Sequence, residues 1–524
     1  MIVTDSPNRR LYLLLAIPFA FAFAFAAACD DEKDDDDDDD DRADAATIID
    51  VGERDASQNA AGDAGTNDSG VSGPNPPGPC QGFPLPASQH FVADGLCASV
   101  VAFEQGELRQ IAFAPNGDLF GVLVSGQVRR YRDIDADGAY ASNTPEIIDW
   151  ADTGGNNGHN VHIDTTGGFI YAGTPQGVKR WRYTAALDSG GPGEDVMVGQ
   201  PSSGTHRYHP VHVYDGMMYV DSGSANNIVH PMDPQARASN DYDTVRAVIK
   251  RFDLSTFTPG TPLEWSAGEV YARGLRNVVG FTRDASGRLY GVMNGIDGLR
   301  YQGRDISTDN PGDTLVLIER GGRYGYPYCF SANFVRTSSG VVAPGTQLAG
   351  EAMNLAEPMQ PFMNPHDDAW CQANSTPPLT NFQAHTAPLD IALAQGMPAS
   401  LPASLHRGAF VALHGSWNRV SSVGHNIVFV PFDASGRPAM ATTTSTGVVF
   451  SYVPIFGGGS AGQFRDGLWS WTDGTRGETR VRPVGVAISP LDGALFVSSD
   501  NGRINGMPSA NAPNGAIYRI SRQQ

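Results

Sequence analysis

Basic residues are scarce in this chain of 524 residues, which holds 36 Lys and Arg against 57 Asp and Glu and has a net charge of -21. Such a charge offers no basic face to a phosphate backbone, so we predict no nucleic-acid partner. Charged residues make up only 18% of the chain, whereas Gly and Pro number 61 and 36. This composition favours many turns and few long helices.

Cysteine is also rare, with five residues and no Cys-x-x-Cys pair, which argues against a cysteine metal site. Four of the five follow the N-terminal region, and an even number in an exported chain favours disulfides. The simplest pairs are Cys80 with Cys97 and Cys329 with Cys371.

One long apolar run, residues 11–28, follows Arg9 and Arg10 and ends in three alanines before Cys29. A positive n-region, an apolar h-region and small residues at a cleavage site predict export. The position of Cys29 indicates a bacterial lipoprotein signal, with residues 1–28 as the signal peptide and Cys29 lipidated; an ordinary signal peptide or an uncleaved anchor is the alternative. We therefore expect a membrane-anchored lipoprotein that faces the periplasm or the cell exterior and contacts the membrane only through its lipid.

Residues 29–79 are predicted to be a disordered linker. Residues 30–68 hold seventeen acids and three bases, hence a charge of -14, and include an unbroken run of aspartates from Asp34 to Asp41. Like charges at this density repel one another and cannot form a core. The segment is either a spacer that holds a domain off the membrane or a low-complexity stretch with no function.

A pattern of short strands recurs six times within residues 80–524. An alternating apolar strand meets a Gly- or Asp-centred turn, and two further strands follow; the copies begin at Ile111, Val161, Val211, Val279, Leu389 and Val484. Repeats of about fifty residues or more predict an all-β, six-bladed β-propeller, because each small sheet buries its faces against its neighbours. A pair of β-sandwiches is the alternative that six copies argue against. Residues 320–384 and 433–480 exceed the repeat and are predicted to be long loop insertions.

The stretch from His406 to Phe432 gathers unusual chemistry. Its apolar runs flank a loop in which His414, Trp417, Asn418 and Arg419 supply imidazole, indole, amide and guanidinium groups within six residues. That set suits a polar, partly anionic ligand. The alternative is a surface turn with a buried Trp417 and a salt-bridged Arg419.

From about residue 103 to residue 521 the chain resembles the soluble-type glucose/sorbosone dehydrogenases, six-bladed propellers that use pyrroloquinoline quinone and calcium. The resemblance rests on five motifs in order: Gly-Leu-Arg-Asn at 274–277, Tyr-Gly-Tyr-Pro-Tyr-Cys at 324–329, Ala-His-Thr-Ala-Pro-Leu at 384–389, His-Gly-Ser-Trp-Asn-Arg at 414–419 and Arg-Pro-Val-Gly-Val at 482–486. It implies an enzyme that oxidises an aldose or sugar aldehyde and passes electrons to a respiratory acceptor.

The resemblance also implies a catalytic base. The family's histidine lies in a Gly-x-His stretch, which is Gly204-Thr205-His206 here, and it takes the hydroxyl proton while hydride leaves the carbon. Read without the family, His206 is one loop histidine among several.

Two pairs of residues match the family's cofactor-binding residues: Arg276 with Asn277, and Arg480 with Arg482. The guanidinium fork suits the three carboxylates of the quinone. The alternative is that each arginine simply pairs with a carboxylate of the protein. The side chains expected around the funnel mouth are those of His159, His385, His414 and Arg419.

Calcium is implied at the backbone carbonyls of Gly295 and Ile296, where it would polarise the quinone as a Lewis acid. The chain lacks the family's Gly-Pro step at this point. A separate calcium candidate is the Asp-x-Asp-x-Asp-Gly spacing of Asp133, Asp135 and Asp137, although Thr144 stands where an EF-hand has its acid. A bare Asp-rich turn is the other interpretation.

Three functions therefore compete. The first is the quinoprotein oxidoreductase. The second is a non-catalytic carbohydrate- or ligand-binding propeller, which is favoured by the altered Gly-Pro step and by His209 in place of the family's arginine. The third, a propeller lactonase-type hydrolase, needs an open metal site of acids and an Asn, which the motifs lack.

Overall fold

The computed structural model describes residues 83–85 and 90–523, except residues 104, 143, 157, 229–244, 353–363, 397–399, 417–418, 420–421, 441, 444–448, 459–463, 466–467, 470–480 and 501–514. The described residues belong to one compact unit, residues 64–524. The signal peptide, Cys29, the whole linker and Cys80 lie outside them, so these remain predictions. No described helix is long and apolar enough to cross a membrane.

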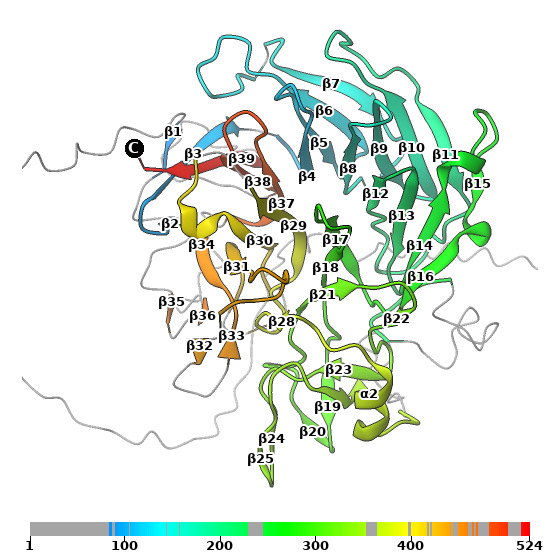
Figure 1. The fold of residues 1–524 in the computed structure, drawn as a ribbon, viewed down its shortest axis with the longest axis vertical. Helices are drawn as coiled ribbons and strands as arrows, with labels where there is room; N and C mark the ends of the chain where they lie inside the picture. Colours follow the sequence, from blue (N-terminus) through cyan, green and yellow to red (C-terminus); the bar gives the residue numbers. More distant parts are fainter. Residues whose placement is uncertain are drawn as a thin grey trace, which may run out of the picture. The chain divides into compact units, whose positions relative to one another are not determined.

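Six antiparallel sheets form the blades of the predicted all-β propeller (Figure 1). From the inner strand outward, blade one consists of β4 (Leu108–Phe113), β5 (Leu119–Leu123), β6 (Gln127–Tyr131) and β7 (Ile147–Asp152). Blade two consists of β8 (Val161–Asp164), β9 (Phe169–Thr174), β10 (Gly177–Arg182) and β11 (Glu194–Val198). Blade three consists of β12 (Val211–Tyr214), β13 (Met217–Ser222), β14 (Val248–Asp253) and β16 (Glu269–Arg273). Blade four consists of β17 (Val278–Arg283), β18 (Leu289–Met293), β21 (Thr314–Ile318) and β28 (Thr380–Asn381). Blade five consists of β29 (Pro388–Gln395), β30 (Arg407–Leu413), β31 (Asn426–Pro431) and β34 (Val453–Gly458). Blade six consists of β37 (Pro483–Ile488), β38 (Leu495–Ser499), β39 (Ala516–Arg522) and β3 (Leu96–Phe103).

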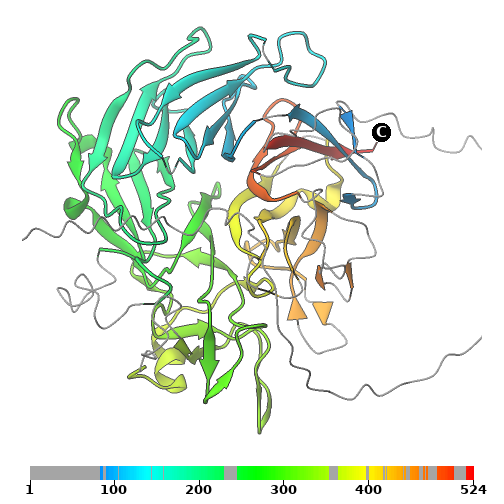
Figure 2. The same ribbon diagram turned by 180° about the vertical axis from the view of Figure 1, so that it is seen from behind.

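The ring is closed by a strand from the N-terminal side of the unit. β3 pairs antiparallel with β39, with Val100 opposite Tyr518, and so completes the sixth blade (Figure 2). The outer edges are extended by β1 (Phe83–Pro84) on β3, β2 (His90–Val92) on β34, and two parallel additions, β15 (Leu263–Glu264) on β11 and β22 (Gly322–Arg323) on β16. Pairing the two ends of the unit in one sheet makes the ring a single cooperative structure.

The blades pack face to face, which explains their strand composition. Every residue of β5 is buried, because both faces of an inner blade strand meet a neighbouring blade. Between the first two blades, the large buried side chains of Trp150, Trp181 and Phe120 share one cluster with Ile170. The near-continuous apolar runs in the sequence therefore mark strands buried on two sides.

Two buried side-chain amides form hydrogen bonds across the centre of the ring. Gln110 on β4 donates from Nε2 to the carbonyl oxygens of Val279 on β17 and Leu389 on β29, at 2.8 and 2.7 Å. Asn160, just before β8, donates to Gln110 Oε1 at 3.0 Å and accepts from Val211 N on β12 at 2.8 Å. Since β17 and β29 do not neighbour β4 in the ring, these bonds join inner strands that no sheet connects.

We expect Gln110→Ala to lower the free energy of unfolding by about 2–4 kcal/mol, because it removes three buried hydrogen bonds, those to Val279 O, Leu389 O and Asn160 Nδ2. The measurement is a urea titration followed by fluorescence. The matched control is Gln372→Ala on the exposed face of α2 (Asp368–Asn374), which should change stability by less than about 0.5 kcal/mol. Equal midpoints for Gln110→Ala and the control would contradict a structural role for the central network.

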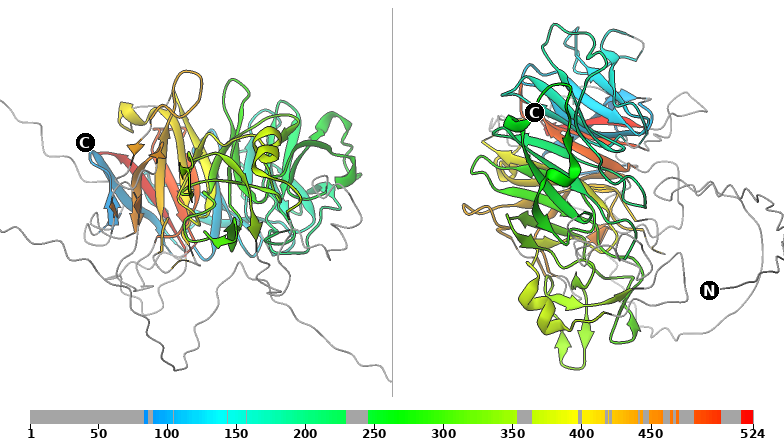
Figure 3. Two further views of the ribbon diagram at one scale, coloured as in Figure 1. Left: turned by 90° about the horizontal axis from the view of Figure 1, so that it is seen from below. Right: turned by 90° about the vertical axis from the view of Figure 1, so that its right-hand side faces the viewer.

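Two insertions extend the fourth blade at its outer end (Figure 3). One lies between β18 and β21, and the other is the predicted insertion at 320–384, between β21 and β28. Together they contain α2 and the short strands β19 (Leu299–Tyr301), β20 (Arg304–Asp305), β23 (Cys329–Ser331), β24 (Arg336–Thr337), β25 (Gly340–Val341), β26 (Gln347–Ala349) and β27 (Glu351–Ala352).

One predicted disulfide is confirmed. Cys329 on β23 and Cys371 on α2 are bonded, which fastens the helix to the insertion. Cys97 on β3 is also disulfide-bonded. Its predicted partner, Cys80, lies outside the described residues.

Candidate active site

The predicted site residues gather at one end of the ring for a topological reason. In each blade the inner and second strands are antiparallel, so the start of the first and the end of the second lie at the same end. His159, His206, Arg276, His385 and Arg482 all lie just before an inner strand, whereas Asn227, Asn294, His414 and Asp500 follow a second strand.

His206 is a buried imidazole whose tautomer is set by its neighbours. Its Nδ1 lies 3.0 Å from the carbonyl oxygen of Ser224 and 2.8 Å from Ser224 Oγ. The hydroxyl proton of Ser224 is donated to Asn226 O at 2.7 Å, so both oxygens accept from Nδ1–H. Nε2 is therefore the unprotonated nitrogen. Burial, aided by the positive charge of Arg276, lowers the pKa of His206 to about 3, so the imidazole is neutral at physiological pH.

Arg276 is held by four hydrogen bonds beside His206. It donates to Asn227 O at 3.1 Å, to Asn227 Oδ1 at 2.8 Å and to Asn294 O at 3.4 Å, and it pairs with Asp297 at 3.2 Å. Its side chain is only 5% exposed. A guanidinium fixed this firmly is preorganised to bind an anion with little loss of side-chain entropy.

The backbone beneath these groups leaves no room for a side chain at Gly223. A Cβ atom there would lie 2.7 Å from His206 Cβ and 3.0 Å from Asn277 Oδ1. The glycine therefore allows the imidazole and the Asn277 amide to approach the second strand of the blade closely.

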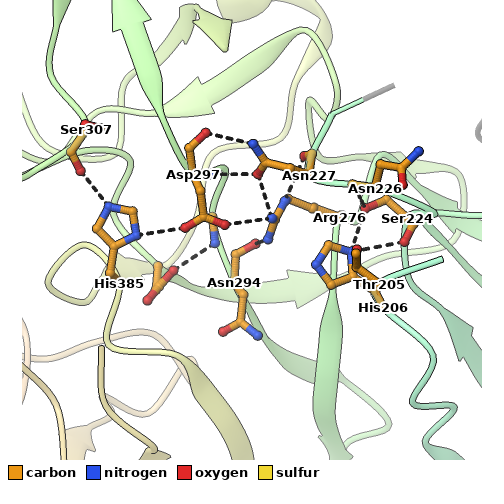
Figure 4. Close-up of polar contacts among 12 residues, drawn as sticks. Thr205, His206, Ser224, Asn226, Asn227, Arg276, Asn294, Asp297, Ser307 and His385 are labelled. Atoms are coloured by element: carbon orange, nitrogen blue, oxygen red, sulfur yellow. Dashed lines mark hydrogen bonds and ion pairs between the residues drawn. The ribbon is translucent and has the colours of Figure 1, made fainter. Parts of the chain in front are cut away.

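Asp297 joins Arg276 to His385. Its Oδ1 lies 3.3 Å from His385 Nδ1, and His385 Nε2 lies 2.5 Å from Ser307 O (Figure 4). Burial alone would raise the pKa of Asp297, but His385 and Arg276 outweigh it and lower that pKa. Burial likewise opposes the charge on His385, and its bond to Asp297 nevertheless raises the pKa of that imidazole.

A second polar network lies on the other side of the ring's mouth. Asp500 accepts from Arg109 at 2.7 Å and lies 3.0 Å from His414 Nε2, while Arg482 lies 3.1 Å from His414 Nδ1. Arg109 also donates to His159 Nδ1 at 3.2 Å. Burial and the charge of Arg482 lower the pKa of His414 to about 4.

Tyr208 connects the two networks. Its ring centroid lies 4.7 Å from that of His159 and 4.9 Å from the guanidinium carbon of Arg109. Because Tyr208 is two residues from His206, one short segment contacts both groups of polar side chains. The mouth thus holds two guanidinium-containing networks, one on each side of this segment.

Several buried polar atoms in the mouth have no partner within the described part of the chain. They are Asn277 Oδ1, Asn294 Oδ1 and Arg482 Nε. Buried polar groups are nearly always hydrogen-bonded, so these atoms are available to a polar ligand. Two of them are amide oxygens, which accept, and one is a guanidinium N–H, which donates, so the ligand must both donate and accept hydrogen bonds.

The remaining predicted residues are placed less centrally. Arg419 donates to Ala384 O and to Asp309, each at 3.4 Å, beside His385. Arg480, Trp417 and Asn418 lie outside the described residues. No described donor satisfies the carbonyl oxygens of Gly295 and Ile296, which leaves both free to bind a cation.

The Asp-rich turn lies far along the chain from this site, between β6 and β7. The ligand atoms of Asp133, Asp135 and Asp137 lie within 4.8 Å of one another, and all three residues are exposed. Backbone N–H groups of Asp137, Gly138 and Ala139 already donate to these carboxylates. A calcium ion at this turn stays a prediction.

Sequence reasoning missed the partners that position the site. Asp297, Asp500, Arg109, Ser224 and Ser307 were not predicted as site residues. A usable signal was the position of Asp297 and Asp500 directly after a second strand, where the ends of the strands meet the mouth.

Comparisons with known proteins agree with this arrangement. The model of a family described as TrAA12-like matches residues 90–504. The chain is 29% identical over 377 residues to a pyrroloquinoline quinone-dependent pyranose dehydrogenase of Coprinopsis cinerea, which covers 68% of this chain and 47% of that protein. It is 28% identical over 381 residues to a pyrroloquinoline quinone-dependent sugar dehydrogenase of Hypocrea jecorina, covering 70% and 79%. The chain thus spans about half the length of the first of these relatives.

Solved structures share the fold. An iodide structure of the Trichoderma reesei carbohydrate-active enzyme of family AA12 has a TM-score of 0.64 at 24% identity and covers 85% of this chain and 100% of that one. The pyranose dehydrogenase domain from Coprinopsis cinerea, in its holo form, has a TM-score of 0.62 at 23% identity and covers 84% and 99%. The match over residues 90–504 shows that the chain belongs to the TrAA12-like family, which confirms the resemblance to quinone-dependent sugar dehydrogenases at the level of the family.

Proposed function

We propose that this protein is a quinoprotein sugar dehydrogenase that oxidises an aldose in its pyranose form, or a related sugar aldehyde, with pyrroloquinoline quinone and calcium. The observation that supports it most is the pairing of a neutral, correctly oriented His206 with the fixed guanidinium of Arg276 in one buried mouth. The names of the two relatives point to the same chemistry.

Each residue has a stated task in this proposal. His206 Nε2 accepts the proton of the sugar hydroxyl at the carbon being oxidised. Arg276, Asn277 and Arg482 bind the carboxylates and polar edge of the cofactor, and Asp297 holds Arg276 in place. The carbonyl oxygens of Gly295 and Ile296 would bind calcium. When bound, the quinone would supply the acceptor for the hydride, which carries both electrons that leave the sugar.

The test is reconstitution of the purified protein with pyrroloquinoline quinone and calcium, followed by dye reduction with a panel of aldoses. We expect sugar-dependent reduction that disappears when calcium is removed by a chelator. Saturable binding of the quinone with no turnover on any sugar would instead favour the non-catalytic binding propeller.

The pH profile of turnover gives an independent prediction. A histidine with a pKa near its usual value gains a proton as the pH falls through about 6.5, whereas His206, at about 3, stays a neutral base. We therefore expect kcat to be level from about pH 8 to about pH 5 and to fall only in more acid solution, where the base is protonated. A loss of kcat with an apparent pKa near 6.5 would contradict the environment described for His206.

Export and anchoring remain part of the proposal. Lipidation of Cys29 would place the dehydrogenase on a membrane facing the periplasm or the cell exterior, where a respiratory carrier takes its electrons. Cys29→Ala should move the protein from the membrane to the soluble fraction of the host cell.

A further inference from the structure

A cavity lies beside the mouth, between the two insertions of the fourth blade. It has a volume of about 290 Å³. One wall is the segment from Arg304 to Asn310, between β20 and β21, and the other is formed by Phe334 and Arg336 in the later insertion; the lining residues are Arg304, Asp305, Ile306, Thr308, Asp309, Asn310, Phe334 and Arg336. The proposed function does not use it.

Hydrogen bonds join the two walls, so the cavity cannot collapse without breaking them. Asn310 is buried, and its Oδ1 accepts from Asn333 N at 2.9 Å and from Phe334 N at 3.1 Å, while its Nδ2 donates to Phe334 O at 2.9 Å. At the other end, Arg304 donates to Arg336 O at 2.7 Å. A gap held open in this way is preorganised for a ligand.

The first wall also contacts the candidate active site. Ser307, whose carbonyl oxygen meets His385, lies in the middle of that wall segment (Figure 4). Asp309 accepts from Arg419, which also donates to Ala384 O. The same loop therefore lines the cavity and contacts the His385 end of the candidate active site.

The cavity lining holds two arginines, Arg304 and Arg336, and two aspartates, Asp305 and Asp309, all four of them exposed. Phe334 supplies an aromatic face, and the guanidinium carbon of Arg336 lies 5.0 Å from its ring centroid. Within the described residues neither Arg304 nor Arg336 forms an ion pair, whereas Asp305 already accepts two hydrogen bonds from Ser307. Aromatic walls with a few oriented polar groups are typical of small-ligand sites, and guanidinium groups that form no ion pair favour carboxylates.

We infer that this cavity is a subsite for a second saccharide unit bearing a carboxylate, so that the enzyme's substrates include uronate-containing oligosaccharides. The inference rests on the proposed function for the identity of the reacting sugar. It extends that function by naming a substrate class and the two arginines that select it.

The test compares cellobiouronic acid with cellobiose, which differ by a carboxylate in place of a hydroxymethyl group. In the reconstituted enzyme we expect a KM about tenfold lower for the acid, with equal kcat, because one charge-assisted hydrogen bond is gained. Arg304→Gln combined with Arg336→Gln should raise that KM about tenfold and leave the KM for cellobiose unchanged. Arg300→Gln is the matched control, since Arg300 donates to Gly303 O and does not line the cavity.

Calorimetry of both disaccharides with the protein free of quinone separates this inference from the proposed function. Arginine-dependent binding of the acid without dye reduction by any sugar would support the subsite and contradict the proposed function. Turnover of both disaccharides with equal KM in the wild type, or a preference for the acid that persists in the double variant, would overturn the subsite and leave the proposed function intact.

Discussion

His206→Ala is expected to lower kcat by about a thousandfold while the quinone still binds, because the variant removes the base that we propose takes the hydroxyl proton. Ser224 fixes Nδ1 as the protonated nitrogen, so Nε2 is the free base, and burial keeps it neutral. The measurement is steady-state dye reduction beside a quinone titration of the same sample.

The control for this variant is His406→Ala. His406 is half-buried at the far end of β30 from the mouth, and its Nε2–H donates to Leu401 O at 2.8 Å. It should retain wild-type turnover. Full turnover of His206→Ala would mean that another group is the base, whereas loss of quinone binding would mean that His206 acts on the cofactor.

Arg276→Ala should weaken quinone binding by about a hundredfold, because a carboxylate loses a charge-assisted guanidinium bond in a buried site. It should also lower the free energy of unfolding by about 3–5 kcal/mol, since the buried Asp297 carboxylate loses its guanidinium partner. Arg276→Lys keeps a positive charge but loses the fork, so we expect it to recover stability more than affinity.

A buried ion pair elsewhere in the same blade provides the comparison. Arg288 pairs at 2.6 Å with Asp284, whose side chain is fully buried, in the turn between β17 and β18, at the end of the blade away from the mouth. Arg288→Ala should therefore lower stability but leave quinone affinity at the wild-type level. If Arg276→Ala changed stability alone, in the manner of Arg288→Ala, the proposed contact with the cofactor would be wrong.

The blades could be predicted from the sequence because their signal is local. Each copy, such as the one that begins at Ile111, contains its own apolar alternation and its own turn, and the inner strands appear where the pattern places them. The outer strands are harder to predict from the sequence. β3 completes a sheet whose other strands lie near the opposite end of the unit, and no local pattern announces that pairing.

The candidate site was predicted in part, for a related reason. Individual residues such as His206 and Arg276 lie within motifs, so a resemblance could find them. Their partners depend on contacts between distant segments: Arg109 and Asp500 are 391 residues apart, and His385 meets Ser307 across 78 residues. Only the closed ring brings such pairs together, and the central amide of Gln110 went unnoticed for the same reason.

The most direct test of the central claim is a titration of the quinone-free protein with pyrroloquinoline quinone in calcium-containing buffer, followed by absorbance, with Arg276→Ala titrated in parallel. We predict saturable binding of one quinone per chain, a clear loss of affinity in the variant, and reduction of the bound quinone when an aldose is added. A spectrum that never saturates, or binding that is identical in the two proteins, would contradict a cofactor site in the mouth of the ring.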